Sequence, residues 1–245
     1  MHIPDGFLSR NICGAMGVVA LAVIGYCIRR ARAMLFEKVK VLKTKLVTAQ
    51  GPGVGEYSTK SILSALGRKK ASLMGAVGGF VFAAQMLNFP VKYGTSGHLI
   101  GGVLAAILLG PFEAAIVMTI ILVVQAFLFS DGGIFALGAN IFNMGILATM
   151  GGYYLYYFLK KILSGKRGIL FSAFIAAWLS VVWASIACSL ELGFSRTYSL
   201  SRTLPAMVNL HILIGLCEAL ITIGILTFIL KAKPELLKGE GENET

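Results

Sequence analysis

Residues 94–129 have the sequence GTSGHLIGGVLAAILLGPFEAAIVMTIILVVQAFLF, and this stretch decides how many times the chain can cross a membrane. It contains only two ionisable side chains, His98 and Glu113. As one α-helix it would be about 54 Å long, whereas the hydrocarbon core of a bilayer is about 30 Å thick. Gly110-Pro111 lies near its middle, and proline disfavours a helical conformation at the residue before it. The sequence therefore predicts two helices that meet in a tight turn at Gly110.

Five further stretches are long and apolar enough to be membrane spans. With the two central helices they predict seven spans, and the basic residues support that number. Seven spans place 18 of the 22 Lys and Arg residues on one side, whereas a single central span would divide them 13 to 9. Because cytoplasmic loops carry the excess of Lys and Arg, we expect the N-terminus outside and the C-terminus in the cytoplasm. The five stretches are residues 12–28, 71–91, 132–159, 168–190 and 203–230.

The composition agrees with an integral membrane protein. The chain is 57% hydrophobic and 13% charged, whereas soluble domains are about 45–50% apolar and about 25% charged. The net charge of +11 comes from short basic blocks between uncharged stretches, which is typical of topology signals and not of a nucleic-acid-binding surface. We therefore predict an all-α, polytopic membrane protein in which residues 1–245 form a single membrane domain.

Residues 31–70 are predicted to be a cytoplasmic insert, and residues 231–245 a cytoplasmic tail. Four apolar residues of the insert recur at helical spacing among lysines, which predicts a basic amphipathic helix on the membrane surface. These residues are Leu35, Val39, Leu42 and Leu46.

A glycine-rich segment of the insert, residues 51–61, is similar to a phosphate-binding loop. Thr59 stands where such a loop has a glycine before its lysine, which here is Lys60. We therefore expect no nucleotide site, and a pump that uses this chain would need a separate ATPase.

The first six residues, Met1-His-Ile-Pro-Asp-Gly6, contain groups that can chelate a metal ion. A free N-terminal amine, the backbone nitrogen of His2 and its imidazole can close a five-membered and a six-membered ring on one metal ion. With a fourth nitrogen the set becomes square planar, the geometry of Cu(II) or Ni(II). We predict that residues 1–11 form an extracellular metal-binding segment and that the first span is retained, since no signal-peptide cleavage site follows it. The alternative is an extracellular tail in which His2 has no role.

The chain has two other histidines, and both are predicted to lie toward the outside. His98 follows Thr95-Ser-Gly97 at the start of the third span. His211 lies about two turns into the last span, and Glu218 follows seven residues later on the same helical face. Ionisable side chains within spans are functional candidates because their burial in lipid is costly. For His211 the alternative is a hydrogen bond to a carbonyl of a neighbouring helix.

Five blocks of the sequence, in this order, resemble the substrate-capture (S) component of energy-coupling-factor (ECF) transporters for nickel or cobalt, the NikM/CbiM-like family. The likeness extends over nearly the whole chain except the insert. The blocks are Met1-His-Ile-Pro-Asp-Gly-Phe-Leu8, Ala83-Ala-Gln-Met-Leu-Asn-Phe-Pro90, Gly94-Thr-Ser-Gly-His-Leu-Ile-Gly-Gly102, Leu109-Gly-Pro111, and Asp131-Gly-Gly133 with Ala136-Leu-Gly-Ala-Asn-Ile-Phe-Asn-Met-Gly145.

The resemblance implies seven membrane helices in the cell membrane of a prokaryote. It also implies that a transported metal ion is held by the amine of Met1, the amide and imidazole of His2, and the imidazole of His98. Nickel displaces an amide proton more readily than cobalt does, so we expect Ni²⁺ first and Co²⁺ as the alternative. The chain would then be a transporter subunit without enzymatic activity or a cofactor of its own. Its partners would be a transmembrane coupling (T) subunit, cytoplasmic ATPase subunits and, as a further candidate, a small accessory membrane subunit.

Polar groups around such a site are expected to orient its ligands. Each candidate could instead cap a helix or bond a neighbouring one. The candidates are Gln85, Asn88, Ser96, Asp131, Asn140, Asn143 and His211.

A stripe of small residues runs along the second span, at Ala71, Gly75, Gly79 and Ala83. Such a stripe permits close approach of another helix. The family resemblance suggests that it docks on the coupling subunit, and the alternative is packing within this chain.

A protein of another class remains as an alternative. Gly94-Thr-Ser-Gly97 fits the G-x-S-G pattern, and His211 could serve Ser96 as a base, as in rhomboid-type intramembrane serine proteases. The upstream His-x-x-x-Asn that these proteases use for oxyanion stabilisation is missing, because His2 is the only earlier histidine and Gly6 stands at the Asn position.

Overall fold

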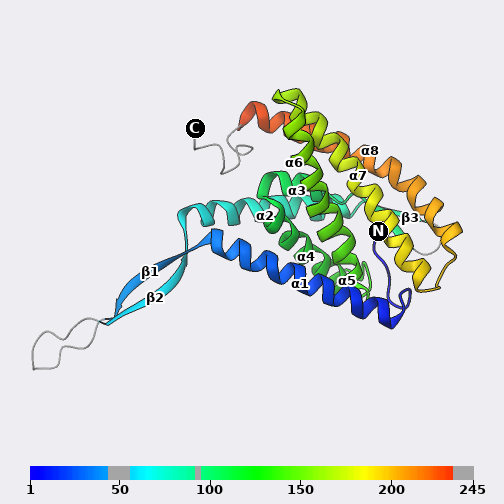
Figure 1. The fold of residues 1–245 in the computed structure, drawn as a ribbon, viewed down its shortest axis with the longest axis horizontal. Helices are drawn as coiled ribbons and strands as arrows, with labels where there is room; N and C mark the ends of the chain where they lie inside the picture. Colours follow the sequence, from blue (N-terminus) through cyan, green and yellow to red (C-terminus); the bar gives the residue numbers. More distant parts are fainter. Residues whose placement is uncertain (44–55, 92–94, 234–245) are drawn as a thin grey trace, which may run out of the picture.

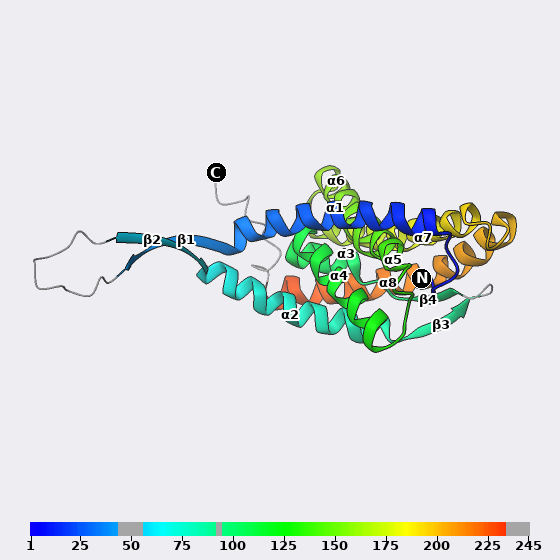
Figure 2. The same cartoon turned by 90° about the horizontal axis from the view of Figure 1, so that it is seen from below.

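Helices dominate the computed structural model, which describes residues 1–43, 56–91 and 95–233. The long helices pack side by side in an elongated bundle, and two short β-hairpins are added to it (Figures 1 and 2). In chain order the elements are α1 (Arg10–Leu35), β1 (Phe36–Lys43), β2 (Glu56–Leu63), α2 (Ala65–Gln85), β3 (Asn88–Val91), β4 (Thr95–His98), α3 (Gly102–Leu109), α4 (Pro111–Leu128), α5 (Leu137–Asn140), η1 (Ile141–Gly151), α6 (Gly152–Ile162), α7 (Gly165–Phe194) and α8 (Leu200–Ala232).

The predicted break in the central apolar stretch is confirmed. Helix α3 ends at Leu109 and α4 begins at Pro111, where the missing amide of proline costs no helical hydrogen bond. Gly110 between them has a φ of +91°, a conformation that glycine adopts without steric cost. The turn leaves α3 as a short, largely buried helix inside the bundle.

Four helices of the described residues are long and apolar enough to cross a membrane, namely α1, α4, α7 and α8. The helical run from residue 137 to residue 162 continues through α5, η1 and α6 without a gap. Helix α2 is shorter in its apolar part, because Arg68, Lys69 and Lys70 lie in its first two turns. Large apolar side chains on the outside of the bundle, such as Leu21, Phe158 and Phe228, suit a lipid-facing surface.

The core of the bundle includes many small side chains. Ala105 and Ala106 in α3, Ala114 and Ala115 in α4, and Ala184 in α7 are fully buried. Small residues allow the backbones of membrane helices to approach closely, which increases dispersion contacts where lipid provides no hydrophobic driving force. This packing places the ends of α4, α7 and α8 around the N-terminal segment (Figure 1).

The amphipathic helix predicted in the insert is wrong. Helix α1 ends at Leu35, and the chain continues as β1, which pairs with β2 in antiparallel register from Phe36↔Leu63 to Lys43↔Glu56. In the sequence Val39 and Val41 alternate with lysines, and β-branched residues fit a strand at least as well as a helix. The returning strand supplies the backbone partners that decide the matter, and residue 46 lies outside the described residues. The hairpin extends from the end of the bundle opposite the N-terminus (Figures 1 and 2).

A second hairpin corrects the predicted bounds of two spans. Helix α2 ends at Gln85 and α3 begins at Gly102, and between them β3 and β4 pair from Asn88↔His98 to Val91↔Thr95. His98 therefore ends a strand and does not begin a membrane helix. Proline at position 90 and glycine at positions 94 and 97 disfavour helix in this segment.

Candidate metal centre

The first residues of the chain lie buried at one end of the bundle. Met1 and Ile3 are fully buried, and His2 is 3% exposed. The side chain of Asn140 accepts a hydrogen bond from the Ile3 amide at 2.9 Å and donates one to the Ile3 carbonyl at 3.2 Å, while the Gly133 amide donates to that carbonyl at 2.8 Å. These bonds fix the main chain one residue beyond His2.

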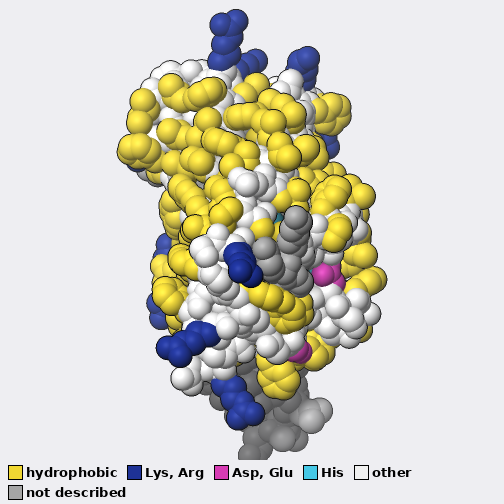
Figure 3. Space-filling model, turned by 90° about the vertical axis from the view of Figure 1, so that its right-hand side faces the viewer, with side chains coloured by type: hydrophobic (Ala, Val, Ile, Leu, Met, Phe, Trp, Pro, Cys, Tyr) yellow, Lys and Arg dark blue, Asp and Glu magenta, His cyan; other side chains and the backbone are white. Residues whose placement is uncertain are grey.

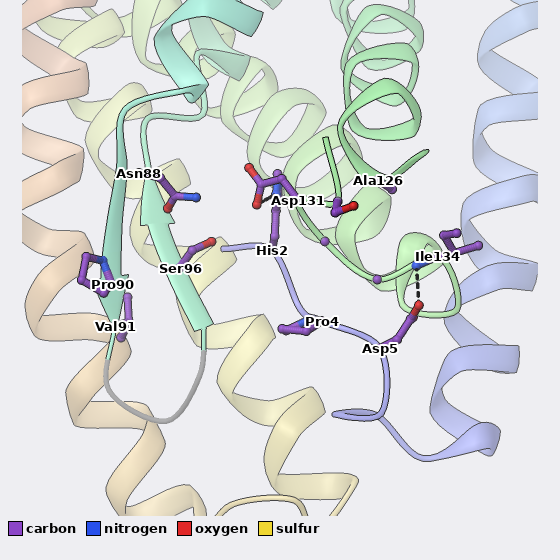
Figure 4. Close-up of a pocket in the computed structure, with 13 residues that line it drawn as sticks. His2, Pro4, Asp5, Asn88, Pro90, Val91, Ser96, Ala126, Asp131 and Ile134 are labelled. Carbon is purple, nitrogen blue, oxygen red and sulfur yellow. Dashed lines mark hydrogen bonds and ion pairs between the residues drawn. The ribbon is translucent and has the colours of Figure 1, made fainter. Parts of the chain in front are cut away.

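Asp5 fastens the same segment to the loop that follows α4. Its carboxylate accepts hydrogen bonds from the backbone amides of Ile134 at 3.0 Å, Phe135 at 2.8 Å and Ala136 at 3.3 Å (the first is drawn in Figure 4). Gly6 follows with a φ of +84°, which turns the chain toward α1. The polar and turn-forming residues of the chain start thus anchor it to the bundle.

The fold brings two of the predicted ligands together. The imidazole rings of His2 and His98 lie with their centroids 4.5 Å apart and their planes inclined by 62°. The Nδ1 of His98 lies 2.7 Å from the Leu99 carbonyl oxygen. Because a carbonyl only accepts, Nδ1 carries the proton and Nε2 keeps a free lone pair. That Nε2 is buried and has no hydrogen-bond partner, and the same holds for Nε2 of His2.

Asp131 lies beside His2, as the sequence predicts for a supporting group. The Nδ1 of His2 is 2.7 Å from Oδ1 of Asp131. Burial lowers the pKa of His2 despite this carboxylate, so the ring is neutral near pH 7 and donates a hydrogen bond. Burial alone would raise the pKa of Asp131, but the hydrogen bond and positive charge of His2 and the N-terminal amine lower it overall.

The N-terminal amine is also prepared to act as a neutral nitrogen ligand. Its burial lowers the pKa of the Met1 amine from 8.0 to about 5, against smaller opposing contributions from Cys188 and Asp131. The pKa of His98 is well below its usual value, chiefly through burial and then through the charges of the amine and His2. All three nitrogen groups are therefore unprotonated near pH 7.

A cavity of about 740 Å³ leads to His2 (Figure 4). The end of the bundle is mostly covered by apolar and uncharged atoms, and only a small area of histidine surface shows on it (Figure 3). The cavity therefore borders the buried ring of His2. Its polar lining residues are His2, Asp5, Asn88, Ser96, Ser130 and Asp131.

Side chains alone do not complete a metal site in the part of the chain that the structure describes. No group of three or more His, Cys, Asp or Glu side chains there is arranged to hold a metal ion. A metal ion held by the two histidines would therefore need donors other than such side chains.

Residues 2–236 match the protein family CbiM, described as the cobalt uptake substrate-specific transmembrane region. The chain belongs to the CbiM family. The resemblance stated from the sequence motifs is thereby confirmed, and with it a role in nickel or cobalt transport.

CbiM relatives and a solved structure agree over most of the length. A putative fused nickel transport protein NikMN of Archaeoglobus fulgidus is 38% identical over 240 residues, which cover 97% of this chain and 68% of that protein. A putative cobalt transport protein CbiM of Methanococcus voltae is 28% identical over the full length of both. The crystal structure of a truncated transition metal transporter superposes with a TM-score of 0.77 at 29% identity and covers 94% of this chain and 99% of that one.

In this CbiM chain the other predicted supporting residues divide into two groups. Asn88 and Ser96 line the cavity next to His2. Gln85 is buried and donates from Nε2 to the Ile100 carbonyl at 2.7 Å, so it contacts the main chain near His98. Asn143 instead donates to Glu191 at 2.8 Å and supports packing between η1 and α7.

His211 bonds to its own helix and not to a neighbouring helix, which was the alternative raised from the sequence. Its Nδ1 lies 2.6 Å from the Met207 carbonyl oxygen one turn earlier in α8, so the ring is bonded to its own helix. Sequence reasoning missed Gln125, whose Nε2 donates to Oε1 of Gln85 at 2.9 Å, and it gave no partner for Glu218. The signal for both was a polar side chain inside an apolar span.

Proposed function

We propose that this CbiM-family chain is the substrate-capture component of an ATP-driven importer of the ECF type, and that it takes up Ni²⁺, or alternatively Co²⁺. The observation that carries the proposal is the buried start of the chain. There the ring centroids of His2 and His98 are 4.5 Å apart. Both rings have an unpartnered Nε2. The amine beside them is neutral near pH 7 because burial lowers its pKa to about 5.

The proposed ligands are four nitrogens in one plane. The amine of Met1 and the amide nitrogen of His2 close a five-membered ring on the metal ion. The amide nitrogen and Nδ1 of His2 close a six-membered ring, and Nε2 of His98 completes the square. Such a set is the geometry of Ni(II) or Cu(II), so the supply of metal contributes to selectivity along with the site.

Metal capture requires one exchange at His2. Its Nδ1 is bonded to Asp131 at 2.7 Å, and it is also the nitrogen that closes the six-membered ring. On metal binding Nδ1 would therefore release Asp131, its proton would move to the unpartnered Nε2 of the same ring, and the amide of His2 would lose its proton to solvent. The carboxylate remains near the centre, where its negative charge favours an incoming divalent cation.

The proposed topology places this centre at the outer face. Seven spans, with 18 of 22 basic residues on the opposite side, put the N-terminus outside and the β1–β2 hairpin in the cytoplasm, in the plasma membrane of a prokaryote. Captured metal then has to pass inward, and partner subunits including ATPases would drive the change.

The small-residue stripe on α2 is the proposed docking surface for the transmembrane coupling subunit. Ala71, Gly75, Gly79 and Ala83 are all exposed, and a Cβ atom added at Gly75 or Gly79 would meet nothing within 4 Å. This exposure favours docking over internal packing, the alternative raised from the sequence. Gly75 and Gly79 line a groove between α2 and α4 whose other residues are apolar, such as Phe82.

The test is metal binding by the purified protein. Addition of one residue before Met1 displaces the amine, and His98→Ala removes the fourth nitrogen. We expect each change to abolish high-affinity nickel binding in calorimetry and to remove the yellow absorption of square-planar Ni(II). Unchanged affinity in either variant would rule out the proposed ligand set.

The protease alternative receives no support. Ser96 Oγ is buried without a hydrogen-bond partner, and His211 is bonded through Nδ1 to the Met207 carbonyl. A nucleophile and base within hydrogen-bond reach are the signature that such a mechanism requires.

A further inference from the structure

Glu218 holds the main chain just after His98 from the other side of the bundle. Its side chain is buried in α8, at 3% exposure. Oε2 accepts a hydrogen bond from the Ile100 amide at 2.6 Å, and Oε1 accepts one from the Gly101 amide at 3.0 Å. A carboxylate that accepts two consecutive amides fixes both the position and the tilt of that backbone.

The first of these bonds reaches His98 through a single peptide group. The amide of Ile100 and the carbonyl of Leu99 belong to the same peptide unit, and Nδ1 of His98 donates to that carbonyl at 2.7 Å. The chain of contacts is therefore His98 imidazole, peptide 99–100, Glu218 carboxylate. A negative charge at the N–H end of a peptide makes its carbonyl a stronger acceptor, because neighbouring hydrogen bonds polarise one another.

The carbonyl group of Ile100 is also hydrogen-bonded to a buried side chain. The Ile100 carbonyl accepts from Nε2 of Gln85 at 2.7 Å, and Oε1 of Gln85 accepts from Gln125 at 2.9 Å. Ile100 thus has both backbone groups bonded to buried side chains, to Glu218 of α8 at its amide and to Gln85 of α2 at its carbonyl, and Gln125 of α4 supports Gln85. The strand end that carries His98 cannot shift without breaking at least one of these bonds.

We propose that Glu218 is a positioning residue for metal capture, which orients the His98 imidazole and increases the electron donation of its Nε2 through the peptide group between Leu99 and Ile100. Metal-binding histidines commonly donate their other ring nitrogen to a carboxylate or carbonyl, which fixes the tautomer and strengthens the ligand. Here the carboxylate acts one peptide further away. The inference rests on the proposed function, since it needs His98 to be a ligand.

The test compares Glu218→Gln with Glu113→Gln, both measured on the purified full-length protein with nickel as the probe. Each oxygen of Glu218 accepts one backbone amide, whereas glutamine would place an NH₂ group, itself a donor, against one of those two amides. We expect Glu218→Gln to weaken nickel binding about tenfold to one hundredfold, in line with other residues that support metal ligands, and to shift the visible absorption band of bound nickel. Glu113 is the matched control, a buried carboxylate paired with Lys70 at 2.6 Å in the first turn of α4, at the other end of that helix from Asp131. Its variant should keep both the affinity and the band.

Each remaining outcome decides between this role and a structural one. If Glu218 only caps the start of α3, Glu218→Gln lowers the thermal midpoint but leaves affinity and band as in the wild type, and the proposal is overturned. Glu218→Asp keeps two acceptor oxygens on a side chain one methylene shorter, so we expect it to bind nickel more tightly than Glu218→Gln and less tightly than the wild type. If the glutamine variant does not fold, the affinity of the aspartate variant is the measurement that tests the proposal. Gln85→Leu removes the support on the other side of Ile100. If this variant and a folded Glu218→Asp variant both bind nickel with the affinity of the wild type, the proposal is also overturned. If the wild type binds neither Ni²⁺ nor Co²⁺, the proposed function fails and this inference with it. Wild-type binding that is lost in His98→Ala leaves only the role of Glu218 in question.

Discussion

At the scale of single residues, the candidate centre depends on nitrogens that burial keeps unprotonated. The amine of Met1 has a pKa of about 5, and the pKa values of His2 and His98 are also lowered, in each case chiefly by burial. A metal ion that enters such a site releases no proton to solvent from the amine or the two imidazoles at pH 7, because the Nδ1 proton of His2 only moves to Nε2 of the same ring. It has to displace only the amide proton of His2.

This difference predicts how many protons nickel releases. With the amine neutral, we expect about one proton released per nickel ion at pH 7, whereas an amine with its ordinary pKa near 8.0 would raise the number to about two. Nickel affinity should fall more steeply below about pH 5, where the amine becomes protonated in the folded protein. Calorimetry in buffers of different protonation enthalpy measures the number, and a value near two at pH 7 would contradict the neutral amine.

At the scale of helices and strands, the two hairpins lie at opposite ends of the bundle, and the α2–α4 groove lies between them. β3 and β4 bring His98 to the chain start, and β1 and β2 extend from the opposite end (Figure 2). Between these ends the groove presents its glycines outward without covering side chains. The structure thus separates the proposed capture site from the proposed docking surface.

That separation predicts that docking can be removed without loss of metal binding. Gly75→Leu with Gly79→Leu fills the groove on α2 with side chains that have open space, so the isolated protein should fold and bind nickel as before. We expect the doubly substituted chain to lose assembly with the coupling subunit, as measured by co-purification. Gly14→Leu, on the exposed face of α1, is a matched control that should keep assembly. Loss of nickel binding in the doubly substituted chain would mean that the stripe supports the fold of this chain instead.

At the scale of the whole molecule, the bundle has one end with the buried chain start and one end that carries most of the basic residues. Ser9 donates from its amide to Ser195 Oγ at 3.1 Å, which ties the chain start to the turn between α7 and α8. The turn between α6 and α7 lies at the other end of α7, beside Lys166. The two turns therefore report on opposite sides of the membrane if the proposed orientation is correct.

Labelling of cysteines from outside tests this orientation. In a variant with its four native cysteines replaced by serine, Ser201→Cys and Lys166→Cys each add one exposed thiol. We expect a membrane-impermeant maleimide to label residue 201 and not residue 166 in intact cells, and both after lysis. The reverse pattern would place the metal centre in the cytoplasm.

Local properties of the sequence determined the helical character, the break at Gly110-Pro111 and the chemistry of the chain start. Each of these depends on residues close together in the chain: a proline acts on its neighbour, and two chelate rings need only Met1 and His2. The insert shows the limit of this reasoning, because helical spacing and alternation of valine with lysine coexist in residues 36–43. Pairing with the distant strand β2 decided between them.

Only the tertiary structure decided which distant residues meet. It placed His2 against His98 and Asp131, left the α2 stripe exposed, and joined Glu218 to the peptide beside His98. No periodicity encodes these contacts, since they arise where helices from separate parts of the chain pack on one another and buried polar groups must find partners. The sequence therefore determined which groups can bind a metal ion, and the packing of the bundle decided how those groups are brought together and oriented.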